Sequence, residues 1–226
     1  MQEVPYKEYV SNIGKKIQIA NTEFILEKPA AIENVEIPFE LECSTVYSFP
    51  KRGNWITHGL NAKYRGNFAP QIPRNMILRY SNENEIVLDP FCGSGTTMIE
   101  TKLLNRKGVG VDINKDALLL TWNRLDFSPT KNIELFQGHA GDLTKLKDES
   151  VDLIVAHPPY ANIIQYSDEK DDLSKLNIPE FISSMKVIAT EFYRVLKPEK
   201  YCAVLIGDTR IKGLYQPIAF QVMNQF

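Results

Sequence analysis

The sequence has few of the residues that mark secreted, metal-binding or membrane-spanning proteins. Its three cysteines, Cys43, Cys92 and Cys202, show neither disulfide nor metal-site spacing, which favours a reducing compartment. His58 and His139 have no metal-ligand companions nearby in sequence, so no metal is expected. The sequence shows no signal-peptide pattern and no apolar run long enough to cross a bilayer. We therefore expect a cytoplasmic protein without a membrane partner.

The net charge is also small, but the charges are unevenly distributed along the sequence. The net charge of the 226 residues is −2, whereas residues 51–80 contain six basic residues and no acidic one. Aromatic rings and a histidine are interleaved with these charges: Trp55, His58, Tyr64 and Phe68. This pattern predicts contact with nucleic-acid phosphates and bases, and a solvated basic surface is the alternative. The predicted phosphate ligands are Lys51, Arg52, Lys63 and Arg65. The acidic run 168–172 predicts a polar loop that faces away from nucleic acid.

A glycine-containing loop follows an apolar run at 85–88. It reads Asp-Pro-Phe-Cys-Gly-Ser-Gly-Thr-Thr over residues 89–97 and precedes a predicted helix. Its two glycines, Gly93 and Gly95, allow a sharp turn close to a ligand, and the helix start offers free N–H groups. Asp112 ends the next predicted strand, at an offset that suits hydrogen bonds to ribose hydroxyls. A dinucleotide site would need a third glycine, and a ligand-free turn is the remaining alternative.

A second loop follows the apolar run at 151–156. It reads His157-Pro158-Pro159-Tyr160. The two prolines have no N–H to donate, so carbonyls before and between them can accept hydrogen bonds from an amino group. The tyrosine ring can stack on a flat ring, although an ordinary strand-ending turn would also use proline. Because loops at neighbouring strand ends share a crevice, the two loops together suggest chemistry on a nucleobase.

The order of these motifs resembles that of the S-adenosylmethionine-dependent DNA amino-methyltransferases of the N4-cytosine/N6-adenine type. The resemblance covers about residues 45–226. It implies that S-adenosylmethionine binds at Asp89, Pro90, Phe91, Gly93, Ser94, Gly95, Thr96 and Thr97, and at Asp112 and Ile113. It also implies that residues 157–160 bind the target amine, with His157 standing where the family has Asp, Asn or Ser.

Two other segments complete the predicted cofactor site. Residues 65–73 are similar to an additional cofactor motif of the family, in which Phe68 and Pro70 would flank the cofactor. Asp142 follows the third predicted strand and would meet the adenine amine of the cofactor, unless it only forms a turn.

The alternation of apolar strands and periodic helices predicts an α/β fold with a doubly wound, mostly parallel, Rossmann-like sheet. Strands are expected near 85–90, 108–113, 132–137, 151–156 and 201–207, and helices near 96–105, 115–125, 178–197 and from Pro217 onward. Residues 1–44 are expected to be an N-terminal extension packed on a catalytic domain at 45–226. The resemblance implies that the family's C-terminal strand pair is missing from this domain.

The sequence thus predicts a methyltransferase that acts on an exocyclic amino group of a DNA base, with cytosine N4 as the first choice. Adenine N6, guanine N2 or another position in RNA, and a non-catalytic binding module remain alternatives. The expected cofactor is S-adenosylmethionine and the expected partner is DNA, with RNA possible. The oligomeric state stays open.

Overall fold

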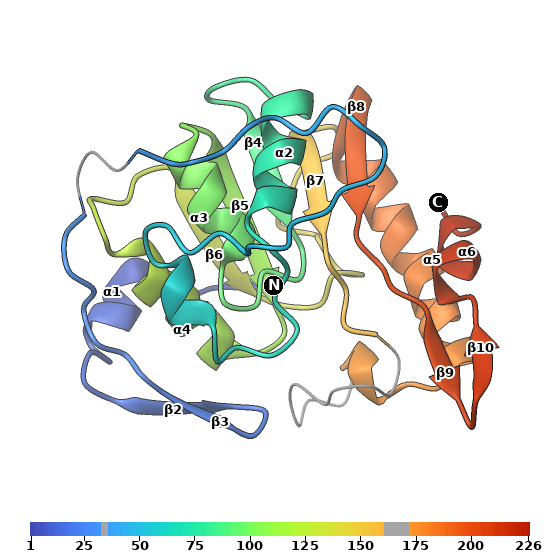
Figure 1. Cartoon of the computed structure of the whole chain (residues 1–226), viewed down its shortest axis with the longest axis horizontal. Coiled ribbons are helices and arrows are strands. Elements are labelled where there is room, and N and C mark those ends of the chain that lie inside the picture. The colour runs from blue at the N-terminus through green and yellow to red at the C-terminus, as the bar shows by residue number, and fades with distance from the viewer. Residues whose placement is uncertain (33–35, 161–171) are drawn as a thin grey trace.

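The computed structural model describes residues 1–32, 36–160 and 172–226, and its centre is a six-stranded sheet (Figure 1). The strand order is β1-β6-β5-β4-β7-β8, with β4 to β8 parallel and β1 antiparallel to β6. The strands are β1 (Gln2–Glu3), β4 (Ile86–Asp89), β5 (Lys107–Asp112), β6 (Ile133–Gln137), β7 (Val151–Ala156) and β8 (Leu196–Val204). The order reverses beside β4, which is where open α/β sheets form a ligand crevice. The predicted doubly wound, mostly parallel sheet is confirmed.

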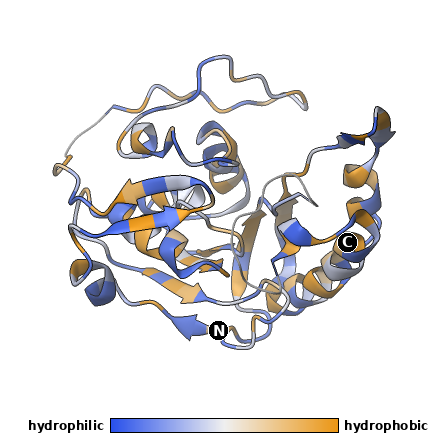
Figure 2. Cartoon of the chain, turned by 90° about the horizontal axis from the view of Figure 1, so that it is seen from below, coloured by the Kyte–Doolittle hydropathy of each residue, from blue (hydrophilic) through white to orange (hydrophobic). Residues whose placement is uncertain are grey.

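Helices cover both faces of this sheet because successive strand residues point to opposite sides. In β7, Leu153 and Val155 pack beneath α2, whereas Ile154 and Ala156 pack beneath α5 and α6. One face carries α2 (Gln71–Tyr80), α3 (Thr96–Leu103) and α4 (Lys115–Leu125), and the other carries α5 (Ile178–Val195) and α6 (Ile218–Met223). Figure 2 shows hydrophobic residues along the central strands and mixed hydropathy along the flanking helices.

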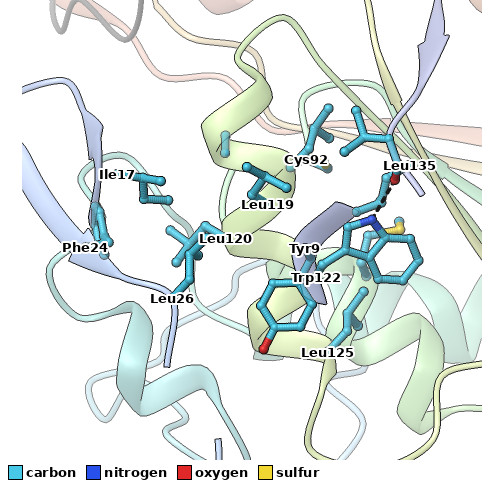
Figure 3. Close-up of a cluster of buried hydrophobic side chains, with 14 of the residues drawn as sticks. Tyr9, Ile17, Phe24, Leu26, Cys92, Leu119, Leu120, Trp122, Leu125 and Leu135 are labelled. Atoms are coloured by element: carbon cyan, nitrogen blue, oxygen red, sulfur yellow. Dashed lines mark hydrogen bonds between the residues drawn. The ribbon is translucent and has the colours of Figure 1, made fainter. Parts of the chain in front are cut away.

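The N-terminal segment is part of this core. It contains β1, α1 (Tyr6–Val10) and a hairpin of β2 (Lys16–Ile19) and β3 (Thr22–Ile25). Tyr9 and Leu26 are fully buried against α4 (Figure 3). Trp122 of α4 donates its indole N–H to the carbonyl of Val4 at 2.7 Å. Since β1 also extends the central sheet, this segment shares one core with the rest of the described chain.

Several elements differ from the sequence-based expectation. Strand β8 begins at Leu196, directly after α5, and not near residue 201. Helix α2 and a separate hairpin of β9 (Thr209–Ile211) and β10 (Leu214–Gln216) were not predicted. Short 3-10 turns occur at η1 (His58–Asn61) and η2 (Leu173–Lys175).

Within the described ranges, β8 is the last strand of the sheet order, and β9–β10 does not extend that sheet. None of the helices in the described part of the chain has the length and apolarity needed to span a membrane.

Candidate active site

A pocket opens at the carboxyl ends of four neighbouring parallel strands. Its wall is formed by residues 90–94 and 96 after β4, 112–114 at the end of β5, 138–140 after β6 and 157–160 after β7. Residues 64 and 66–68, together with Asp172 and Leu173, complete the lining. The glycine loop and the His-Pro-Pro-Tyr tetrapeptide, which are some sixty residues apart in sequence, therefore share one cavity.

Twelve of the predicted site residues line this pocket: Phe68, Pro90, Phe91, Gly93, Ser94, Thr96, Asp112, Ile113, His157, Pro158, Pro159 and Tyr160. Nine of the predicted residues do not line it: Pro70, Asp89, Gly95, Thr97, Asp142, Lys51, Arg52, Lys63 and Arg65.

The glycine loop is held in shape by Asp112. The backbone N–H of Gly93 donates to Asp112 Oδ2 at 2.9 Å, and the N–H of Asn114 donates to Oδ1 at 2.8 Å. Gly93 has φ +50°, and a Cβ there would lie 2.9 Å from the hydroxyl oxygen of Tyr64, so glycine is required. Burial raises the pKa of Asp112 to about 6. Each carboxylate oxygen keeps a lone pair for a ligand hydroxyl.

Three predicted residues support the loop from behind. Asp89 is 1% exposed, accepts from the N–H of Phe91 at 3.0 Å, and has its pKa raised to about 7 by burial. Gly95 has φ +84° and packs on Thr121 of α4, whose hydroxyl donates to the carbonyl of Gly93 at 2.8 Å. Thr97 is fully buried in the first turn of α3. These residues shape the loop without facing the cavity.

The tetrapeptide forms another part of the pocket wall. His157 Nε2 and the Tyr160 hydroxyl are 3.1 Å apart, and the Phe68 ring meets the His157 ring edge-on at a centroid distance of 5.0 Å. Burial lowers the pKa of His157 to about 4, so its imidazole is neutral near pH 7. Gly207 lies beside the Tyr160 ring. The Tyr160 hydroxyl can donate its hydrogen to His157 Nε2 when that nitrogen is unprotonated.

The segment before α2 forms an aromatic wall of the pocket. Arg52 donates to the carbonyls of Asn67 and Phe68 at 3.2 and 2.7 Å. Asn61 donates to the carbonyl of Ser94 at 3.3 Å and accepts through its side-chain oxygen from Arg124 at 2.9 Å. This segment is thereby fixed to the glycine loop and to α4.

Two predicted cofactor contacts lie outside the pocket. Asp142 is exposed, and its Oδ1 accepts from the N–H of Thr144 at 3.4 Å, so the alternative turn role describes it. His139 lines the pocket at this strand end. Pro70 is buried at the start of α2, where it contributes to helix initiation and does not face the cavity.

The sequence-based reasoning missed several pocket-lining residues. Residues 138–140 directly follow a correctly predicted strand, so the strand-end rule alone could have found them. Asp172 belongs to the acidic run that was expected to form an exposed loop, yet it is 2% exposed. The other four residues of that run, 168–171, lie outside the described residues.

The basic segment has two kinds of residue. Lys51, Lys63 and Arg65 are exposed. By contrast, Trp55 and His58 are buried and cannot stack on bases, so that part of the expectation was wrong. Arg52 is also exposed, but its guanidinium already donates to the backbone carbonyls of Asn67 and Phe68.

The pocket carries chemical signs of a polar ligand. Ser94 Oγ and Thr96 Oγ1 are buried and have no hydrogen-bond partner in the described structure. Buried hydroxyls without partners are unfavourable, and ligand groups would satisfy them. Both line the pocket at the start of α3, beside the free N–H groups of its first turn. The hydroxyls and backbone N–H groups at the start of α3 suit the methionine part of S-adenosylmethionine, and the carboxylate of Asp112 can accept hydrogen bonds from its ribose.

Comparison with known proteins agrees with this chemistry. Residues 8–121 match the family model of the N6/N4 methyltransferases, described as a DNA methylase. Residues 81–212 match a model described as a methyltransferase domain.

Curated relatives include DNA and tRNA methyltransferases. The chain is 57% identical over 51 residues to the Type II methyltransferase M.HpaI of Haemophilus parainfluenzae, covering 23% of this chain and 16% of that protein. It is 32% identical over 158 residues to M.MjaII of Methanocaldococcus jannaschii, covering 64% and 29%. It is 34% identical over 110 residues to the tRNA (guanine(10)-N2)-dimethyltransferase of Methanothermobacter thermautotrophicus, covering 48% and 32%. The matched part of the chain thus spans a third or less of each relative.

Among solved structures, TrmN from Thermus thermophilus has a TM-score of 0.50 at 18% identity, over 69% of this chain and 49% of that one. This similarity concerns the Rossmann-like fold alone. The two family models and the pocket identify the cofactor as S-adenosylmethionine. The chain belongs to the S-adenosylmethionine-dependent DNA amino-methyltransferase family.

Proposed function

We propose that this chain transfers a methyl group from S-adenosylmethionine to an exocyclic amino group of a base in DNA, with cytosine N4 as the target. The observation that carries the proposal is that the His157–Tyr160 tetrapeptide and the glycine loop line one pocket. The match to a DNA methylase model supports DNA as the nucleic acid. The choice of cytosine rests on family resemblance.

The chemistry assigned to the tetrapeptide follows from its backbone. An exocyclic amine is a poor nucleophile because its lone pair is delocalised into the ring. In a duplex it is also buried, so the base must be flipped into the pocket. Carbonyl oxygens of His157 and Pro158 would accept the two amine hydrogens, and the ring of Tyr160 would stack on the base. When bound, S-adenosylmethionine supplies an electrophilic methyl group.

His157 is assigned a positioning role. Its Nε2 is within hydrogen-bond distance of the Tyr160 hydroxyl, and its imidazole is neutral near pH 7. A neutral imidazole accepts through one ring nitrogen only. If Tyr160 donates to that nitrogen, the imidazole orients the stacking ring and the backbone carbonyls receive the target amine.

Methylation of a guanine N2 in RNA is the second candidate. It is favoured by the tRNA (guanine(10)-N2)-dimethyltransferases among the relatives, one of which is 26% identical over 70% of this chain. A guanine N2 amine could use the same carbonyl acceptors and stacking ring, so the pocket alone does not choose between the two bases.

The test is a methyl-transfer assay with tritiated S-adenosylmethionine on duplex DNA, single-stranded DNA and tRNA, followed by mass spectrometry of the nucleosides. The proposal expects N4-methylcytosine from DNA. N6-methyladenine would correct the base, and N2-methylguanosine from tRNA would establish the second candidate. Cofactor binding without transfer to any of these substrates would instead indicate a binding module.

A further inference from the structure

Asp172 is a buried acidic residue in the pocket wall for which neither sequence motifs nor family models suggest a role. It is 2% exposed and precedes η2. Its Oδ1 accepts from the N–H of Ser174 at 2.9 Å and from the Ser174 hydroxyl at 2.6 Å. These bonds fix the carboxylate at the N-terminus of η2 while the residue lines the same cavity as the glycine loop.

The charge of the pocket is one-sided. Among the described residues that line it, two are acidic, Asp112 and Asp172, and none is lysine or arginine. The two carboxylates are close enough for the charge of Asp172 to raise the pKa of Asp112, in addition to the larger effect of burial. Aromatic rings of Tyr64, Phe68 and Phe91 also line the cavity, and aromatic faces attract cations. This lining favours a ligand that carries positive charge.

S-adenosylmethionine carries positive charge at its sulfonium and at its α-ammonium group. We propose that Asp172 is a cofactor-binding carboxylate that pairs with this positive charge, separately from the hydrogen bonds that Asp112 can make to the ribose. The unpartnered buried hydroxyls of Ser94 and Thr96 are an independent sign that the same cavity receives a polar ligand. The inference rests on the cofactor of the proposed function and not on its nucleic-acid substrate.

The test uses Asp172→Asn, which removes the charge but retains an oxygen that can accept from Ser174. Calorimetry would compare three ligands for the wild type and the variant. These are S-adenosylmethionine, S-adenosylhomocysteine, which lacks the sulfonium charge, and methylthioadenosine, which lacks both charges. We expect an affinity loss of about tenfold or more for S-adenosylmethionine, as for a lost charge-assisted hydrogen bond. Methylthioadenosine should bind the variant and the wild type equally.

The comparison of the three ligands shows which positive charge of the cofactor pairs with Asp172. An equal loss for S-adenosylmethionine and S-adenosylhomocysteine would assign Asp172 to the α-ammonium, and a loss for S-adenosylmethionine alone would assign it to the sulfonium. Unchanged affinity for all three ligands, or an equal loss that includes methylthioadenosine, would overturn the proposal. The matched control is Asp142→Asn, which removes one negative charge from an exposed position outside the pocket. Because no nucleic acid is present, failure of the proposed base or substrate would not affect the result.

Discussion

Replacing Glu100 by glutamine should destabilise the fold strongly and loosen the aromatic wall of the pocket. Glu100 lies in α3, just beyond the glycine loop, and its side chain is fully buried. Its Oε1 accepts from Trp55 Nε1 and from His58 Nε2, both at 2.7 Å. Its Oε2 accepts from Arg74 Nη1, also at 2.7 Å. One carboxylate thus joins the segment before α2, α2 itself and α3.

The expected loss follows from what glutamine keeps. A glutamine has nearly the same size and can still accept from Trp55 or His58, but it cannot pair with the cation of Arg74. The Arg74 side chain is only 13% exposed, so water replaces its partner poorly. Removing one member of a buried ion pair typically costs about 3–5 kcal/mol. We expect a loss near the lower end, about 3 kcal/mol, which for a chain of this size lowers Tm by roughly 6–12 °C.

Urea unfolding followed by circular dichroism would measure the loss, and calorimetry well below Tm would measure cofactor affinity. Affinity should fall because the segment that Glu100 anchors carries Phe68 into the pocket wall. Glu23→Gln is the matched control, since Glu23 pairs with Lys16 at 3.0 Å on an exposed hairpin. Such exposed pairs contribute little to stability. A Glu100→Gln variant no less stable than this control would refute the reasoning.

Four further predictions concern the site. Asp112→Ala should weaken cofactor binding several-fold or more in calorimetry, and unchanged affinity in the variant would remove the ribose assignment. The affinity of the wild type should fall as the pH drops below about 6, because protonation of Asp112 removes acceptor capacity. Charge reversal at Lys63 and Arg65, both exposed, should weaken DNA binding and flatten its salt dependence, and an unaltered salt slope would leave these residues as solvated surface. Tyr160→Ala should remove most turnover and leave cofactor affinity nearly intact, whereas a parallel loss of affinity would point to a structural role. If protonation of His157 limits turnover, the acid limb of kcat should lie near pH 4, where its neutral imidazole becomes charged, and a limb above pH 6 would belong to another group.

The central strands and the helices α3, α4, α5 and α6 were predictable because their signals are local. Strands β4 to β7 coincide with predominantly apolar runs, and α4 was predicted with the bounds that the structure shows, Lys115–Leu125. Asn114 explains where α4 begins, because its side-chain oxygen accepts from the N–H groups of Asp116 and Ala117. Fully buried parallel strands need apolar residues on both faces, which makes such runs easy to recognise.

Two of the elements that differ from the expectation, β8 and α2, contain a proline. Pro198 was interpreted as the end of a helix, but it lies inside β8, beside a register irregularity and next to Glu199, which has φ +61°. Because β8 has a neighbour on only one side in the described sheet, a residue without an N–H is tolerated there. Helix α2 was not predicted, and its Pro73 is tolerated because it lies in the first turn, where N–H groups have no intrahelical acceptor.

In the site, the positions of the loops were predictable from local sequence, whereas the side chains that face the cavity depend on tertiary contacts. The strand-end rule correctly located the loops, because the carboxyl ends of parallel strands meet at one edge of the sheet. It could not choose between His139 and Asp142, since a turn between them decides which side chain faces the cavity. Arg52 and Asp172 were judged from local charge alone, and both proved to be engaged in contacts with distant or buried groups. The charge of a segment therefore predicts a nucleic-acid surface only for side chains that the protein itself does not use, which leaves Lys51, Lys63 and Arg65 as the basic residues to test against DNA.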